Sequence, residues 1–139
     1  MTSRLAVLVL AGGFLVACGG EKDEKERAEA AKPCGAAPAA LASDPTLAPG
    51  FPSPSEVTYT GEEQAGPSRI VRGYWDGEID EAFEGYKDAF DGTDYSVTKE
   101  EQEEVDAEVN FAGGDVSGQV KLVQTCEDRT DVSITIRPS

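Results

Sequence analysis

Four runs of alternating apolar and polar residues in the C-terminal third of the chain constrain its fold most. They cover residues 95–97, 105–111, 116–122 and 132–136, and in each run apolar side chains recur at every second position. This period is that of a β-strand, in which successive side chains point to opposite faces of the sheet. The connecting segments are short enough to favour antiparallel neighbours. We therefore expect residues 94–137 to form a four-stranded antiparallel meander with one apolar face.

A single amphipathic helix is predicted before these runs. Ile79, Phe83, Tyr86 and Phe90 recur at spacings of four, three and four residues, which places them on one helical face. Acidic residues near the start suit the positive N-terminal end of a helix, and Gly92 is suited to its termination.

Two further strands are predicted before the helix. The segments EVTYT and PSRIVRGYW, residues 56–60 and 67–75, read as a hairpin joined by a loop at residues 61–66. A sheet with one apolar face and a helix with one apolar stripe bury both surfaces by packing together. The predicted fold class is α+β, with two layers: one amphipathic helix packed on a curved antiparallel sheet of about six strands, in the chain order hairpin, helix, four-strand meander.

The first residues of the chain differ in composition from this predicted domain. One charge, Arg4, precedes an apolar run of 13 residues from Leu5 to Ala17. A helix of that length reaches roughly 20 Å, which is short of the roughly 30 Å hydrocarbon core of a bilayer. The pattern is typical of a secretory signal.

The end of this run carries a recognisable motif. Leu15, Val16, Ala17 and Cys18 resemble the lipobox of bacterial lipoproteins, with leucine three residues before a cysteine and a small residue directly before it. The resemblance implies that residues 1–17 are a signal peptide, that the thiol of Cys18 carries a lipid, and that the protein is anchored to the extracytoplasmic face of a membrane of the cell envelope. The alternative is an ordinary secretory signal cut nearby, with Cys18 left as a free thiol.

If Cys18 carries a lipid, Cys34 and Cys126 remain as a pair. An exported protein meets an oxidising compartment, where an even number of cysteines favours a disulfide. The bridge would close a loop of about 92 residues, which the chain-entropy model values on the order of 4 to 5 kcal/mol. Two unpaired thiols are the alternative, because spacing alone does not establish that the cysteines approach each other.

A tether is predicted between the anchor and the domain. Residues 21–32 mix acidic and basic side chains without a large apolar residue, and the following segment is rich in Ala and Pro. Such a composition buries too little surface to offset its ordering entropy. Leu41, Leu47, Phe51 and Cys34 are the residues able to attach its end to the domain. The predicted organisation is signal peptide in 1–17, lipidated cysteine and flexible tether in 18–50, and small α+β domain in 51–139.

The composition excludes several classes of function. The chain has 27 acidic and 12 basic residues and no histidine. The charge disfavours nucleic acid as a partner, and histidine is the commonest general base and metal ligand. No phosphate-binding loop, zinc-spaced cysteine pair or nucleophile elbow occurs in the sequence. We therefore predict a protein that is not an enzyme and has no cofactor or bound metal.

Three acidic segments need a separate interpretation. Residues 76–80 and 91–94 place carboxylates around glycines at the two ends of the predicted helix, without the spacing of an EF-hand calcium loop. Helix capping and turn formation are the preferred interpretation. Glu100, Glu101, Glu103 and Glu104 are expected to form a solvated turn, with docking of a basic partner as the alternative.

Tyr74 and Trp75 end the second predicted strand. Packing in the core or at its rim is the preferred interpretation, and a partner contact is the alternative, because both residue types are enriched at interface hot spots. The predicted function is that of a membrane-anchored lipoprotein whose non-catalytic extracytoplasmic domain binds or assembles with a protein partner of unknown identity. The alternative is a carrier of a small apolar ligand or lipid in a cleft between helix and sheet, for which a domain of this size leaves little volume.

Overall fold

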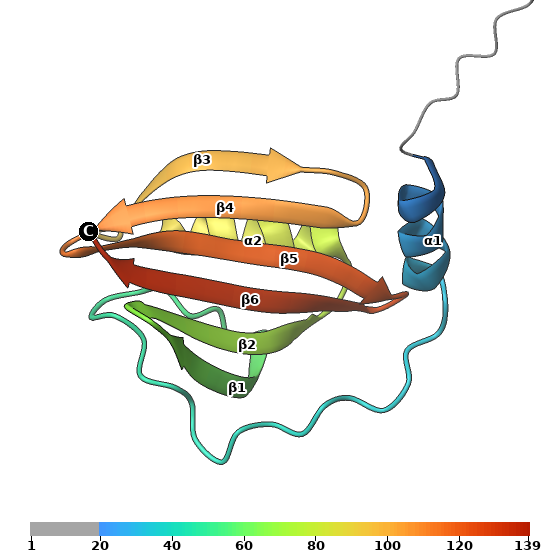
Figure 1. Ribbon diagram of the computed structural model, residues 1–139, viewed down its shortest axis with the longest axis horizontal. Coiled ribbons are helices and arrows are strands. Elements are labelled where there is room, and N and C mark those ends of the chain that lie inside the picture. Colours follow the sequence, from blue (N-terminus) through green and yellow to red (C-terminus); the bar gives the residue numbers. More distant parts are fainter. Residues whose placement is uncertain (1–19) are drawn as a thin grey trace, which may run out of the picture.

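A computed structural model of the protein describes residues 20–139, which form a helix-on-sheet α+β fold (Figure 1). Cys18 and the predicted signal peptide lie outside the described residues. The elements are α1 (Gly20–Ala30), β1 (Val57–Ala65), β2 (Ser68–Asp76), α2 (Ile79–Phe90), β3 (Ser96–Gln102), β4 (Asp106–Gly113), β5 (Val116–Cys126) and β6 (Arg129–Pro138). Among residues 20–139, no helix is both long and apolar enough to span a bilayer.

All six strands belong to one antiparallel sheet with the order β1-β2-β6-β5-β4-β3. The hairpin β1–β2, the helix α2 and the meander β3 to β6 are the predicted units in the predicted order, so the predicted fold class is confirmed. The hairpin joins the meander through β2 and β6, with pairing from Arg69 and Ile136 to Asp76 and Arg129. This long-range pairing makes one continuous sheet for the helix to cover.

Two strand ends differ from the prediction. β1 continues through the predicted loop as far as Ala65, after a bulge between Tyr59 and Gly61, and Gly66 makes the turn with a positive φ of 60°. β3 likewise continues into the predicted acidic turn and includes Glu100 and Glu101. In both places, hydrogen-bonded pairing with the neighbouring strand continues the strand past the residues that show the alternating apolar pattern.

The helix α2 covers one face of the sheet with the predicted stripe. Ile79, Phe83, Tyr86 and Phe90 are each at most 4 % exposed. The facing wall of the core consists of alternate residues of the strands, chiefly Val71, Val109, Phe111, Val120, Leu122, Val132 and Ile134. Burial of each such large side chain contributes about 1.5–3 kcal/mol, so this layer is the main source of stability. β3 is the exception, since Val97 on this edge strand is 36 % exposed.

The two ends of α2 are capped by different groups. At the N-terminus, Glu78 makes no side-chain capping bond, and the Ile79 backbone N–H donates to Oε1 of Gln124 at 3.3 Å. At the C-terminus, Gly92 has a φ of 74°, and the Thr93 hydroxyl donates to the Phe90 carbonyl at 2.7 Å. The predicted termination at Gly92 is therefore found, whereas the N-terminal cap comes from β5.

Residues 32–56 lie along the domain. The Leu41 N–H donates to the Tyr59 carbonyl at 2.8 Å, on the outer edge of β1, and Leu47 packs against the core. Phe51 is 8 % exposed. Its ring lies between the rings of Phe90, Tyr95 and Phe111, at centroid distances of 5.6, 5.5 and 4.9 Å.

The charged segment expected to be a flexible tether forms the helix α1. Glu, Lys and Ala all have high helix propensity, and one end of this helix contacts the domain. Ala30 is buried, and Nε of Arg27 lies 2.7 Å from a carboxylate oxygen of Glu104. Tertiary contacts and the neighbouring disulfide support a helix here that its own sequence only permits. The division of the chain into tether and domain stays a prediction.

Candidate functional site

The disulfide Cys34–Cys126 links the segment before β1 to the end of β5. The two Cα atoms are 5.1 Å apart, and the bridge spans a sequence separation of 92. The predicted pairing of these two cysteines is confirmed. Cys18 lies outside the described residues, so its lipidation stays a prediction.

Arg129 fixes the same region by non-covalent contacts. Its guanidinium donates to the carbonyl of Gly35 at 3.1 Å and to that of Ala36 at 3.5 Å, and it lies 5.3 Å from the centre of the Tyr74 ring. The Glu127 N–H donates to the carbonyl of Lys32 at 2.8 Å. We call the disulfide and these contacts of Arg129 and Glu127 the clasp. Sequence reasoning missed Arg129, because the carbonyls to which it donates are more than 90 residues away and carry no local signal.

Tyr74 and Trp75 lie on opposite faces of β2, as neighbours in a strand do. Trp75 is 7 % exposed, and its ring lies on the helix side, 6.3 Å from that of Tyr86. A Cβ atom at Gly85 would overlap with the Trp75 ring. Tyr74 is 9 % exposed and lies against Arg129. Both positions agree with the packing interpretation and leave little of either ring for a partner.

The acidic segment before α2 does not cap the helix as expected, because Glu78 at the N-cap position makes no side-chain capping bond. The Thr130 hydroxyl donates to the Gly77 carbonyl at 3.0 Å, and Nε2 of Gln102 donates to Oδ1 of Asp80 at 2.6 Å. Asp91 occupies the C-terminal cap position of α2. Within residues 20–139, no three acidic or cysteine side chains are grouped as metal ligands.

The four glutamates of the β3–β4 region are largely paired with cations. Glu100 lies 3.4 Å from Nζ of Lys87, and Glu101 lies 2.8 Å from Nζ of Lys99. The hydrogen bond that Lys99 donates to the Glu101 carboxylate raises the pKa of Lys99 above its ordinary value. Glu104 pairs with Arg27. Three of the four glutamates in the expected solvated turn therefore form ion pairs with cations.

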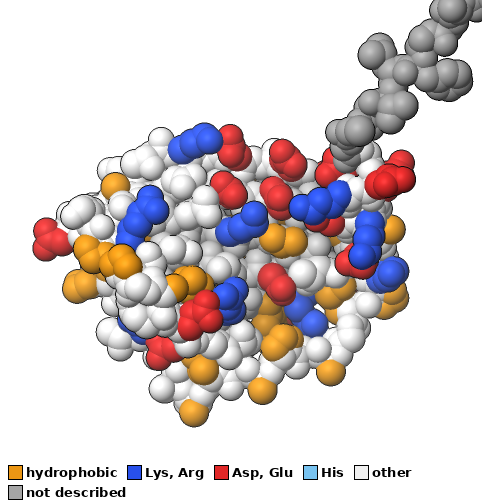
Figure 2. All heavy atoms as spheres, viewed as in Figure 1, with side chains coloured by type: hydrophobic (Ala, Val, Ile, Leu, Met, Phe, Trp, Pro, Cys, Tyr) orange, Lys and Arg blue, Asp and Glu red, His pale blue; other side chains and the backbone are white. Residues whose placement is uncertain are grey.

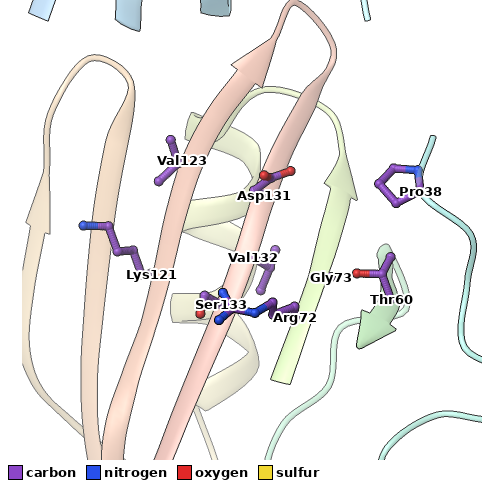
Figure 3. A pocket seen from close by; sticks show the side chains of 9 residues that line it. All are labelled: Pro38, Thr60, Arg72, Gly73, Lys121, Val123, Asp131, Val132 and Ser133. Atoms are coloured by element: carbon purple, nitrogen blue, oxygen red, sulfur yellow. The ribbon is translucent and has the colours of Figure 1, made fainter. Parts of the chain in front are cut away.

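The face of the sheet turned away from α2 is open and polar. Figure 2 shows this face, on which basic and acidic side chains are mixed. A shallow groove of about 360 Å³ crosses it, lined by Pro38, Thr60, Arg72, Gly73, Lys121, Val123, Asp131, Val132 and Ser133 (Figure 3). We call these nine residues the outer groove.

Strand register assembles the outer groove. Ser133 of β6 pairs with Arg72 of β2 on one side and with Lys121 of β5 on the other, and Asp131 pairs with Val123. Burial raises the pKa of the Asp131 carboxyl, while its hydrogen bond with Thr125 opposes that shift. Sequence reasoning missed this site, because a period of two shows which residues face outward but not which strands are neighbours.

The space between α2 and the sheet is filled by side chains. The cavities shown for residues 20–139 are lined by surface positions such as those of the outer groove and the segment 62–64, not by the helical stripe. Aromatic rings, including Phe51 and Phe111, pack edge to face in the core. In the described part of the chain, the apolar stripe of α2 and the facing strands are thus packed against each other.

Comparison of the chain with protein-family models, with curated proteins and with solved structures finds no match.

Proposed function

We propose that the protein is a bacterial lipoprotein, anchored in the cell envelope by a lipid on Cys18, whose extracytoplasmic domain binds or assembles with a protein partner without catalysis. The distribution of cysteines carries the proposal. Cys34 and Cys126 are joined in a disulfide, a bond that persists mainly in oxidising compartments outside the cytoplasm. Cys18 remains, and it follows the apolar run and the Leu-Val-Ala sequence of a lipobox.

The surface of the domain supports a role in binding. The outer groove has a carboxylate at Asp131 and two cationic side chains on one open face. Arg72 is paired with Glu63 at 2.9 Å and Lys121 with Glu108 at 3.6 Å, so a partner would compete with these exposed ion pairs. A shallow groove that combines charged side chains with apolar surface suits contact with a segment of another protein, whereas small apolar ligands need an enclosed apolar pocket.

A substitution at Cys18 tests the anchor. In Cys18→Ser, we expect incorporation of labelled palmitate to fall to background and the protein to leave the membrane fraction, because the acceptor thiol is gone. The readouts are labelling in growing bacteria, fractionation, and the mass of the mature N-terminus.

The chain offers a matched control in the double variant Cys34→Ser/Cys126→Ser. It loses two thiols but keeps Cys18, so labelling and membrane association should be unchanged. Persistent labelling of Cys18→Ser, or equal loss of labelling in the control, would contradict the proposed anchor.

A further inference from the structure

The helix α1 is held to the domain by few contacts of its own. Ala30 is its buried residue, and its ion pair joins Arg27 and Glu104, whose side chains are 53 % and 64 % exposed. Exposed ion pairs contribute little to stability, and an isolated helix of 11 residues is marginal in water. The position of α1 therefore depends on the segment that comes next in the chain.

The clasp lies in that next segment. Lys32, Cys34, Gly35 and Ala36 are all bound to the β5–β6 turn region, by the disulfide and by hydrogen bonds from Glu127 and Arg129. This attachment keeps α1 at the end of the sheet opposite the C-terminus (Figure 1).

The chain beyond the clasp is attached independently of it. The Leu41 N–H bonds to Tyr59 on the edge of β1, and Phe51 is buried among aromatic rings of the core. Opening the clasp therefore releases residues 20–40 and leaves the helix-sheet core in place.

The clasp shortens the connection between the anchor and the domain. The start of α1 at Gly20 is two positions after Cys18, a span of at most about 7 Å, and 11 helical residues add about 16 Å. Without the clasp, the free chain extends from Cys18 to Leu41, which allows a reach of roughly 75 Å. The clasp thus reduces the maximal reach about threefold.

We propose that the clasp is a redox-controlled device that sets how far the domain stands from the membrane and which end faces it. In the oxidised protein, the α1 end lies toward the bilayer. A dithiol reductant transfers two electrons and two protons to the disulfide, forming the thiols of Cys34 and Cys126, and is itself oxidised to a disulfide. Only the hydrogen bonds from Arg129 and Glu127 then remain of the clasp. We infer that these exposed bonds open without the disulfide, so that residues 20–40 are released and the domain moves away from the surface. This inference rests on the proposed anchor at Cys18.

Energy transfer to the bilayer tests the device in the full lipidated protein. Vesicles of phosphatidylethanolamine and phosphatidylglycerol carry an acceptor dye on their headgroups. The donor is attached, through an azide-bearing amino acid rather than a cysteine, at Glu103 beside α1 or at Asp115 near the C-terminus. In the oxidised protein, we expect energy transfer from position 103 to be at least twofold higher than from position 115. After reduction with dithiothreitol, transfer from the two positions should be similar. Equal transfer before reduction, or no change after it, would overturn the proposal.

A second variant frees α1 without touching the disulfide. Ten Gly and Ser residues inserted between Ala31 and Lys32 should lower transfer from position 103 to the reduced level under oxidising conditions, because Lys32 stays in the clasp while α1 is no longer held beside it. Transfer that stays at the oxidised level in this variant would refute the role assigned to the clasp.

Trypsin digestion separates failure of the clasp from failure of the anchor. In soluble Cys18→Ser, reduction should speed cleavage at Lys22, Lys25 and Arg27 at least tenfold, while the near-ultraviolet signal of buried Trp75 stays constant. Unchanged cleavage, or loss of the Trp75 signal, counts against the clasp whether or not the protein is anchored. If reduction speeds cleavage but the native protein carries no lipid, the release of residues 20–40 by reduction stands. The anchor at Cys18 and the control of distance from the membrane are then both excluded.

Discussion

Tyr86 stands out among single residues, because its side chain is fully buried but its hydroxyl has no hydrogen-bond partner among residues 20–139. Burial raises the pKa of this hydroxyl well above the ordinary value of 10.0. A buried polar group without a partner costs free energy that an apolar group of the same shape does not. The ring of Tyr86 thus stabilises the core, and its hydroxyl opposes that effect.

We therefore expect Tyr86→Phe to raise the free energy of unfolding by about 1 kcal/mol at neutral pH. The gain should grow above pH 10. There the unfolded wild type ionises Tyr86, whereas the folded hydroxyl stays protonated, so the wild type loses stability as pH rises. Urea denaturation at several pH values measures both effects.

Tyr95→Phe provides the matched control. The Tyr95 hydroxyl donates to the Pro49 carbonyl at 2.8 Å, so its removal should lower the free energy of unfolding by about 1 kcal/mol. An equal loss of stability in both variants would show that the Tyr86 hydroxyl is hydrogen-bonded in solution and does not destabilise the core.

At the scale of the elements, the close approach of α2 to the sheet depends on one glycine. Gly85 lies within the helix, against the Trp75 ring, where any larger residue would overlap with the indole. The sequence shows the apolar stripe of α2 because it recurs every three to four residues. It gives no sign that the glycine of this helix faces a tryptophan on β2, since the two belong to different elements.

The outer groove is formed by residues of four strands and by Pro38, and its proposed role is testable by charge reversal. We expect Arg72→Glu/Lys121→Glu to abolish co-purification of a protein partner with the lipidated protein, because cations and their hydrogen bonds are lost from the groove. The measurement compares partner bands after mild solubilisation and affinity capture.

Lys25→Glu/Arg137→Glu is the control, since it changes the net charge equally at exposed positions outside the groove. Partner capture should persist in this control. Capture that survives reversal of Arg72 and Lys121 would exclude the groove as the contact surface.

At the scale of the whole molecule, the disulfide restrains the unfolded chain over almost the entire domain. It closes a loop with a sequence separation of 92, so Cys34→Ser/Cys126→Ser should lower the free energy of unfolding by about 4 to 5 kcal/mol. Denaturation followed by Trp75 fluorescence, in a Cys18→Ser background, measures the loss.

The Cys18→Ser protein with its disulfide intact is the reference for this comparison. It should match the double variant once it is reduced, because both then lack the cross-link. A loss below about 1 kcal/mol would show that restraint of the unfolded chain contributes little here.

The amino-acid sequence alone determined the helical stripe of α2, the alternating faces of the strands and the hairpin and meander, because these follow from periods set by local backbone geometry. It also indicated the pairing of Cys34 and Cys126, by elimination once Cys18 was assigned to a lipid. The tertiary structure decided the pairing of β2 with β6, the cap that Gln124 gives to α2, the contacts of Arg129 and the outer groove. Each of these joins residues that are far apart in the chain, and such contacts depend on strand order and register, which a local pattern does not encode.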